Sequence, residues 1–340
     1  MGIESRFVFK DRPGSGALAL RPVVLREPKG TDVLVKIHSA AICGTDLHIY
    51  KWNPWAARTY RPPLRLGHEF AGTVIAVGPE VTTVKSGDHV TAETHIPCGR
   101  CHQCRLNRRH TCEHLQLFSQ LGLGCFSDHT LVPEAALRGI PLAISLEHAC
   151  MMEPLGIAVR AVTDSRIAGA HVLVLGCGSI GLLAIAAARA YGAASVTATD
   201  LSEYRLELAR QMGANMSVTP QPGSLDGFVA DVLIETTGSE AAFTQALAHV
   251  RTGARVIFAS LPEHPFALDI TRHVVLREVT ISGVYGRRID ETWILVERLL
   301  VTHGTTLAKI LTHRIPLEDF EAAFTLAASG NAGKVILQPH

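Results

Sequence analysis

The 340-residue sequence lacks the features that mark membrane and nucleic-acid proteins. Its formal net charge is only +1, so no general basic field attracts nucleic acid. The longest uncharged run, residues 172–188, is interrupted by glycines and is too short to span a bilayer. The amino-terminal MGIESRFVFK has no apolar stretch of the kind found in secretory signals. We therefore expect a globular protein with no membrane and no nucleic-acid partner.

The chain is long enough for two domains with separate cores. Up to about residue 150, short β-type runs such as 33–43, 69–78 and 88–96 lie between Gly, Pro and Asp breaks. From about residue 155 the pattern changes to strands alternating with helices, which predicts βαβ units and a parallel sheet. The last stretch, 316–337, reads as an amphipathic helix, a glycine-rich turn and a strand. The fold class is α/β, with a β-rich lobe followed by a doubly wound lobe.

Cysteine is used mainly in one short segment. Half of the eight cysteines occur there with C-x2-C-x2-C-x7-C spacing, namely Cys98, Cys101, Cys104 and Cys112. Four thiolates on a tight loop can close the tetrahedral shell of one zinc ion and leave no position for substrate. The spacing therefore predicts a structural zinc site rather than disulfides. With no signal sequence, this cysteine usage indicates a reducing, cytoplasmic location.

A glycine motif with the form G-x-G-x-x-G follows the strand-like run 171–176 and begins a helix-like run. In that context the motif predicts a dinucleotide site, with the pyrophosphate at the helix amino terminus. Its members, which we expect to contact the cofactor, are Gly176, Gly178, Ser179, Ile180 and Gly181.

An acidic residue follows the next strand-like run, about twenty residues beyond the motif, where dinucleotide folds bind the ribose. This residue is Asp200, and its charge favours NAD because it would repel the 2′-phosphate of NADP. Asp200 could equally cap the helix that follows it. Arg205 on that helix is a candidate contact for adenine or an ordinary surface residue.

A second metal site is indicated by soft and borderline ligands that are far apart in sequence. Cys43 and His68 are the best candidates, while Glu69 and Glu153 compete for the remaining position. A catalytic zinc takes three protein ligands and leaves one position open, so this set is suited to chemistry.

The order of these features, Gly-His-Glu at 67–69, the four-cysteine loop and then the glycine motif, resembles the zinc-dependent medium-chain alcohol dehydrogenase family along the whole chain. The resemblance implies a GroES-like catalytic domain at 1–154, completed by 298–340, and a Rossmann NAD-binding domain at 155–297. It also implies two zinc ions per chain, NAD as cofactor, a small-molecule alcohol as substrate and a homotetramer. An alternative from another class, a zinc-stabilised binding module, is disfavoured by the near-neutral charge.

The resemblance also implies residue roles. Cys43, His68 and Glu153 would bind the catalytic zinc, and Glu69 would move in and out of its shell. Thr45 and His48 resemble a proton relay that carries the hydroxyl proton to solvent. His95 resembles a position near the substrate.

Several segments resemble the branch of this family that acts on threonine, including 43–55, 93–101, 283–293 and 329–337. We therefore expect oxidation of a secondary alcohol to a ketone, with a β-hydroxy amino acid as substrate. One departure is Ile157, which stands where that branch has an asparagine after the zinc-binding acid. The lost amide leaves open an alternative, a polyol, diol or cyclitol dehydrogenase of the same family.

Overall fold

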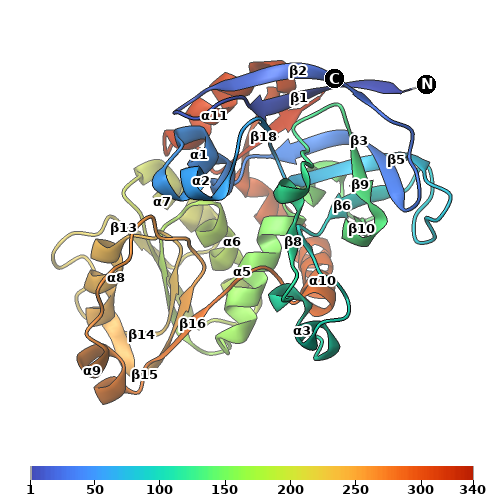
Figure 1. Cartoon of the computed structure of the whole chain (residues 1–340). Coiled ribbons are helices and arrows are strands. Elements are labelled where there is room, and N and C mark those ends of the chain that lie inside the picture. The colour runs from blue at the N-terminus through green and yellow to red at the C-terminus, as the bar shows by residue number, and fades with distance from the viewer. Residues whose placement is uncertain (1, 340) are drawn as a thin grey trace.

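The computed structural model describes residues 2–339, which form a β-rich lobe and a lobe with a parallel sheet (Figure 1). The strands of the β-rich lobe come from both ends of the chain. They are β1 Ile3–Lys10, β2 Leu18–Leu25, β3 Asp32–Ala41, β4 Leu64–Arg65, β5 Glu69–Val77, β6 His89–Ala92, β7 His95–Ile96, β8 Gln116–Leu117, β9 His129–Pro133, β10 Leu137–Gly139, β17 Leu311–Pro316 and β18 Lys334–Gln338.

The main sheet of this lobe has the order β10-β6-β5-β3-β18-β17, with β9 also pairing with β3. A smaller sheet, β2-β1-β4, and the pair β7-β8 complete it. Because β18 pairs with β3, the last strand of the chain lies beside one of the first. The expected carboxy-terminal helix, turn and strand are therefore confirmed, and they complete the β-rich lobe.

The second lobe contains one six-stranded parallel sheet in the order β13-β12-β11-β14-β15-β16. Its strands are β11 His171–Leu175, β12 Ser195–Thr199, β13 Met216–Val218, β14 Ala230–Glu235, β15 Val250–Phe258 and β16 Thr280–Gly283. This is the strand order of dinucleotide-binding folds, and its direction reverses between β11 and β14. The doubly wound prediction is confirmed. Ligands of such sheets bind beyond the carboxyl ends of the strands at this reversal.

Helices cover the parallel sheet and connect the lobes. The α-helices are α1 Gly44–Lys51, α2 Pro54–Thr59, α3 His102–Arg105, α4 Leu146–Ala149, α5 Met152–Asp164, α6 Ser179–Ala190, α7 Glu203–Gln211, α8 Glu240–Ala246, α9 Ile270–His273, α10 Ile289–Leu307 and α11 Phe320–Ala328. The short 3-10 helices within residues 2–339 are η1 Arg109–Thr111, η2 Phe118–Leu121, η3 Glu134–Ala136, η4 Leu247–His249, η5 Val275–Arg277, η6 Ala308–Ile310 and η7 Leu317–Asp319.

The lobes meet along α5 and α10, which pack against each other in the middle of the molecule (Figure 1). The largest apolar cluster of the described residues joins α5, α6 and α10 to the buried strands of the parallel sheet. Both domain boundaries expected from the sequence, after residues 154 and 297, fall inside these two helices. No helix within residues 2–339 is long and apolar enough to cross a membrane.

Candidate active site

The four cysteines of the 98–112 loop come together around α3 and η1. Their sulfur atoms all lie within 4.8 Å of one another, and those of Cys101 and Cys112 are 3.8 Å apart. Zinc–sulfur bonds of about 2.3 Å in a tetrahedron would place neighbouring sulfurs roughly 3.8 Å apart. The loop geometry thus fits the expected structural zinc.

Backbone N–H groups also prepare these thiols for a cation. The Sγ of Cys112 accepts hydrogen bonds from the backbone of Cys98 at 3.2 Å and of His114 at 3.3 Å. A backbone hydrogen bond from Cys104 is the main reason why the pKa of Cys101 is lowered to about 6. Burial, in contrast, raises the pKa of Cys104 to about 12. The backbone contacts therefore favour the zinc-binding thiolate form at Cys101 but not at every cysteine of the loop.

A second group of possible ligands consists of Cys43, His68 and Glu69, whose donor atoms lie within 4.8 Å of one another. The pairing of β3 with β5 explains this, because Ala41 lies opposite Glu69 in the register. Cys43 then follows β3 as the residue before α1, and His68 directly precedes β5. Two segments separated in sequence thus present a thiol, an imidazole and a carboxylate to one point.

The buried Asp46 lies against two members of this group, Cys43 and His68. One of its oxygens accepts a hydrogen bond from the Cys43 backbone at 3.0 Å, and the other lies 3.8 Å from Nδ1 of His68. Burial alone would lower the pKa of His68, but the nearby Cys43 and Asp46 raise it well above its usual value. Burial raises the pKa of Cys43. A carboxylate that orients a histidine is a common support for a metal ligand.

Glu69 is fully buried and forms an ion pair with Lys334 of β18, which is also buried. Its Oε1 atom has no hydrogen-bond donor. A buried carboxylate oxygen without a donor is costly in free energy unless a cation approaches it. This orphaned oxygen, beside a thiol and an imidazole, fits a zinc ion.

Glu153, at the start of α5, lies outside the 4.8 Å group in this structure. Its Oε1 accepts hydrogen bonds from Thr94 at 2.8 Å and from Arg287 at 2.6 Å. Of the two competing acids, Glu69 is therefore the one placed beside Cys43 and His68 here. Glu153 is held next to them by an arginine.

Arg287 is completely buried and connects two carboxylates. Its Nε donates to Oε2 of Glu93 at 2.9 Å, while its Nη1 binds Glu153. Trp293 of α10 donates to the same Glu93 oxygen at 2.9 Å. A Cβ atom at Gly156 would lie 2.3 Å from Cδ of Arg287, so only glycine leaves room for this side chain.

His95 is fixed beside this network. Its backbone donates to Glu93 at 2.8 Å, and its ring meets Tyr285 edge-on at 4.8 Å between centroids. Nε2 of His95 is buried without a hydrogen-bond partner. The residue expected near the substrate therefore has one ring nitrogen available for a ligand.

A cavity of about 550 Å³ lies between the lobes and reaches from Cys43, one of the metal-ligand candidates, to Ile180 of the dinucleotide motif. Cys43, Thr45 and His48 line it from the β-rich lobe. Ile180 and the loops 236–240 and 259–266 line it from the other lobe. The sequence-predicted relay residues thus share one cavity with a zinc-ligand candidate and the glycine motif.

The glycine motif begins after β11, at the reversal point of the sheet, and ends in the first turn of α6. Gly176 has a φ of 87°, which favours glycine, and a Cβ at Gly181 would lie 1.9 Å from the Gly176 carbonyl oxygen. A Cβ at Gly178, in contrast, would meet no atom within 4 Å. The open space at Gly178 beside the amino terminus of α6 fits a pyrophosphate group.

Asp200 lies beside this loop, directly after β12. Its two oxygens accept hydrogen bonds from the backbone of Cys177 at 2.7 Å and of Ser202 at 2.9 Å. Its side chain therefore caps locally and also places a negative charge at the motif. Arg205 donates from Nε to the carbonyl oxygen of Ala332 at 3.3 Å, which connects α7 to the turn before β18.

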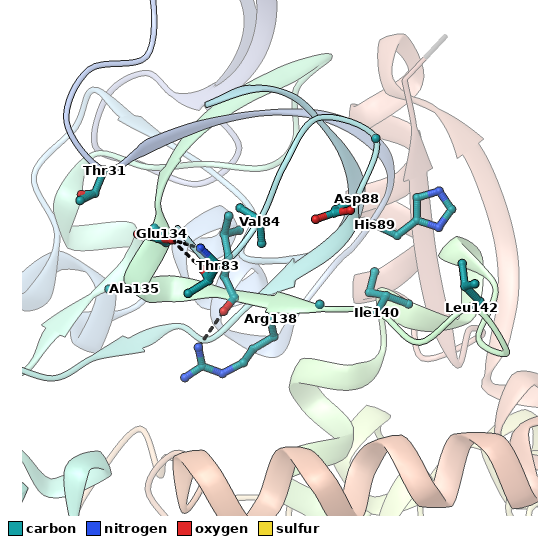
Figure 2. A pocket seen from close by; sticks show the side chains of 13 residues that line it. Thr31, Thr83, Val84, Asp88, His89, Glu134, Ala135, Arg138, Ile140 and Leu142 are labelled. Carbon is teal, nitrogen blue, oxygen red and sulfur yellow. Dashed lines mark hydrogen bonds between the residues drawn. The ribbon is translucent and has the colours of Figure 1, made fainter. Parts of the chain in front are cut away.

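A larger cavity, about 780 Å³, lies elsewhere, on the β-rich lobe between 83–89 and 134–142 (Figure 2). Glu134 there accepts a hydrogen bond from the Thr83 hydroxyl at 2.8 Å, and Arg138 donates to the Leu137 carbonyl at 2.7 Å (Figure 2). The cavity includes none of the candidate metal ligands and no part of the glycine motif. Size alone therefore does not identify the active site.

Two family models match the chain. Residues 29–142 match the alcohol dehydrogenase GroES-like domain, and residues 179–302 match the zinc-binding dehydrogenase domain. L-threonine 3-dehydrogenase of Bacillus subtilis is 41% identical over 96% of this chain and 97% of its own. The enzyme of the same name from Symbiobacterium thermophilum is 40% identical over 98% and 97%.

Solved structures agree with this assignment. The 2R,3R-butanediol dehydrogenase of Bacillus subtilis superposes with a TM-score of 0.86 at 26% identity, covering 99% of this chain and 100% of its own. Galactitol-1-phosphate dehydrogenase of Escherichia coli gives 0.88 at 26%, with 98% and 100% coverage. A zinc-binding dehydrogenase of Sinorhizobium meliloti, solved with NADP, gives 0.88 at 28%, with 99% and 100% coverage.

Fold and site define a zinc-binding oxidoreductase with a GroES-like lobe and a nucleotide-binding lobe. The chain belongs to the zinc-dependent medium-chain alcohol dehydrogenase family, as the sequence motifs predicted. Enzymes of this family use zinc and a nicotinamide cofactor on small alcohols, and this is the class of reaction to which the chain is assigned.

Sequence reasoning missed the buried groups that surround the site. Arg287, Glu93 and Lys334 gave no signal, because a charged residue in a sequence is normally read as solvent-exposed. Gly156, inside α5, likewise gave no hint that it makes room for an arginine. Only their positions in the fold identify these residues as part of the site.

Proposed function

We propose that this enzyme oxidises the β-hydroxyl of L-threonine to a ketone and transfers hydride to NAD. The observation that carries the reaction type is the single cavity in which Cys43, Thr45 and His48 face Ile180 of the dinucleotide motif. The choice of substrate is supported by a sequence identity of 38–41% to L-threonine 3-dehydrogenases over nearly the whole chain.

In this proposal Cys43, His68 and Glu69 hold the catalytic zinc, and Glu153 exchanges with Glu69. When bound, zinc supplies Lewis-acid chemistry that makes an alcohol hydroxyl more acidic, and the nicotinamide ring supplies a hydride acceptor. The Glu69 side chain is fully buried, which keeps bulk water from it. A free ring nitrogen on His95 is available to orient the polar end of the substrate.

Thr45 and His48 are proposed to move the hydroxyl proton away from the reacting centre. Both line the cavity, and His48 is only partly buried, so it connects the interior with solvent. Burial lowers the pKa of His48, which keeps its ring neutral and able to accept a proton at neutral pH. Replacing His48 with alanine should lower kcat by about 10–100-fold while NAD binding is retained.

A second zinc ion is proposed in the four-cysteine loop. It is supported by the four sulfurs, which all lie within 4.8 Å of one another, and would be structural, because four thiolates leave no open position. Elemental analysis of the purified protein should find two zinc ions per chain. Loss of one zinc in a Cys104→Ser variant, with the other retained, would assign the two sites separately.

NAD is the proposed form of the cofactor. Asp200 supports it, because a carboxylate at the end of β12 would repel the 2′-phosphate of NADP. The motif residues Gly176, Gly178, Ser179, Ile180 and Gly181 are proposed to bind the pyrophosphate. Arg205 is proposed to lie along the adenine, with its Nε already fixed by Ala332.

The test is turnover of NAD by the zinc-loaded enzyme with L-threonine, followed as NADH absorbance. We expect threonine to be oxidised, and other small β-hydroxy amino acids to follow it more slowly. A panel of diols, sugar alcohols and cyclitols is run beside it. No turnover of any β-hydroxy amino acid would refute the proposed substrate.

A second candidate is oxidation of a polyol or diol. Ile157 favours it, because this partly exposed apolar side chain stands one turn after Glu153, where an amide could have met a polar substrate group. A buried polar partner left without a hydrogen bond costs on the order of 1–3 kcal/mol. Efficient oxidation of a sugar alcohol with none of threonine would select this candidate.

We also propose the domain division 1–154 with 298–340, and 155–297. The pairing of β18 with β3 supports the return of the chain to the first domain. A homotetramer is proposed from the family resemblance, and sedimentation of the purified protein tests it. A cytoplasmic location is proposed because none of the eight cysteines, all of which lie among the described residues, forms a disulfide.

A further inference from the structure

One carboxylate at the carboxyl end of β14 is completely buried and accepts four hydrogen bonds. Oε1 of Glu235 accepts from the backbone of Thr237 at 2.6 Å, from the hydroxyl of the same residue, and from the backbone of Gly238 at 2.9 Å. Its Oε2 accepts from the hydroxyl of Ser260. All four donors are neutral groups. A buried carboxylate without hydrogen bonds is costly in free energy, so these contacts are what stabilise Glu235 at this position.

The donors to Glu235 come from two different loops. Three of the bonds come from the 236–240 loop, which follows β14, and one comes from the 259–266 loop, which follows the neighbouring strand β15. The backbones of the two loops are also close together, since a Cβ at Gly238 would lie 3.2 Å from Cα of Pro262. Glu235 therefore fixes the position of one loop relative to the other.

The two loops, together the β14–β15 wall, line the cavity between the lobes from the side of the parallel sheet. Cys43 and His48 line the same cavity from the β-rich lobe. The wall also contacts the start of the glycine motif, since a Cβ at Gly176 would lie 2.8 Å from Cγ2 of Thr237. The β14–β15 wall therefore extends from the glycine motif into the cavity that contains a zinc-ligand candidate.

The strand order decides which part of the cofactor meets this wall. The sheet contains the order β12-β11-β14-β15, and the glycine motif follows β11. Asp200, on the adenosine side of the proposed cofactor site, follows β12 on one side of the motif, whereas Glu235 ends β14 on the other side. A dinucleotide whose pyrophosphate binds at the motif therefore extends its nicotinamide half along the β14–β15 wall.

We propose that Glu235 is a positioning residue that joins the 236–240 and 259–266 loops into the binding wall for the nicotinamide half of NAD. The inference deepens the proposed function and rests on the placement of the cofactor in it. Without this carboxylate, two backbone N–H groups and the Ser260 hydroxyl lose their acceptor. The cofactor must then order the loops when it binds, and the free energy of this ordering is lost from its affinity.

The experiment measures the affinity of the zinc-loaded enzyme for NAD and for AMP by titration calorimetry. AMP has the adenosine and one phosphate but no nicotinamide half, so its binding also reports that the lobe is folded. In Glu235→Ala the dissociation constant for NAD should rise about 10-fold, whereas that for AMP should change by less than about 2-fold. Glu235→Gln keeps an oxygen for the backbone donors and an NH2 group that can donate to Ser260, so the constant for NAD should rise at most about 3-fold.

Asp231→Asn is the matched control, because Asp231 lies near the amino end of the same strand, β14. Its carboxylate accepts from the backbone of His171 at 2.8 Å and pairs with Arg251 at 2.7 Å, outside the cavity between the lobes. Its loss should therefore leave the affinity for NAD unchanged. The inference is overturned if Glu235→Ala keeps its affinity for NAD, if it loses affinity for NAD and AMP equally, or if Asp231→Asn weakens NAD binding as much.

These affinities are measured without an alcohol, so this test and the test of the proposed function can fail separately. If wild-type enzyme binds NAD and does not oxidise threonine, the proposed substrate is wrong, and the NAD and AMP constants still decide the role of Glu235. If it binds NADP in place of NAD, the proposed form of the cofactor is wrong, and the same comparison is made with NADP. An enzyme that binds neither cofactor would overturn both proposals.

Discussion

Replacing Arg287 with methionine tests the buried network behind the candidate zinc site. The guanidinium is fully buried between Glu93 and Glu153, and methionine keeps most of the apolar stem while removing the charge. Removing one partner of a buried ion pair leaves an uncompensated charge, which costs about 3–5 kcal/mol. In a protein of this size that loss lowers Tm by roughly 10 °C.

The loss of unfolding free energy in Arg287→Met should also depend on pH. Its direction follows from the two buried carboxylates, Glu93 and Glu153. Burial by itself raises the pKa of Glu93, but Arg287 outweighs it and holds that pKa well below its usual value. The wild-type network therefore stabilises the fold above the ordinary carboxyl pKa of about 4.5 and loses that stabilisation as the pH falls. In Arg287→Met, burial raises the pKa of Glu93. Lowering the pH then protonates this carboxyl group and reduces the destabilisation of the variant.

Urea unfolding at pH 8 and pH 5 measures both effects. The difference in unfolding free energy between wild type and Arg287→Met should shrink at pH 5. Arg288→Met is the matched control, since this neighbouring arginine is 49% exposed and its pair with Asp164, at 3.0 Å, lies near the surface. It should cost at most about 1 kcal/mol. A loss below about 1 kcal/mol for Arg287→Met, or one independent of pH, would refute the reasoning.

Four further variants test the site. Cys43→Ser should abolish turnover and leave far-UV circular dichroism unchanged, and full activity in this variant would show that the thiol is not needed. Cys101→Ser should instead reduce soluble yield, because a closed zinc site contributes roughly 10 kcal/mol to local folding. Asp200→Gly combined with Leu201→Arg should raise kcat/KM for NADP relative to NAD, by removing repulsion and adding a phosphate partner; equal use of both cofactors by the wild type would contradict the role of Asp200. Ile157→Asn should improve kcat/KM for threonine several-fold if an amide there contacts the substrate, and no change in the NADH assay would show that it does not.

The local patterns of the chain determined much of the architecture. Alternating apolar strands and helices after residue 155 predicted the parallel sheet, because period and turn residues are properties of short segments. The four-cysteine loop was predictable for the same reason, since its donors lie within fifteen residues. The glycine motif could be placed because a strand precedes it and a helix follows it.

Tertiary structure decided how distant segments complete the site. The pairing of β3 with β5 places Cys43 beside His68, and the return of β18 places Lys334 against Glu69. The approach of Glu263 to His48 depends on how the two lobes meet across the cavity. None of these contacts has a signature in the sequence, because each joins residues whose separation is set by strand order and lobe packing. Short sequence segments therefore predicted which residues could act as donors, whereas only the tertiary fold decided how those residues are arranged.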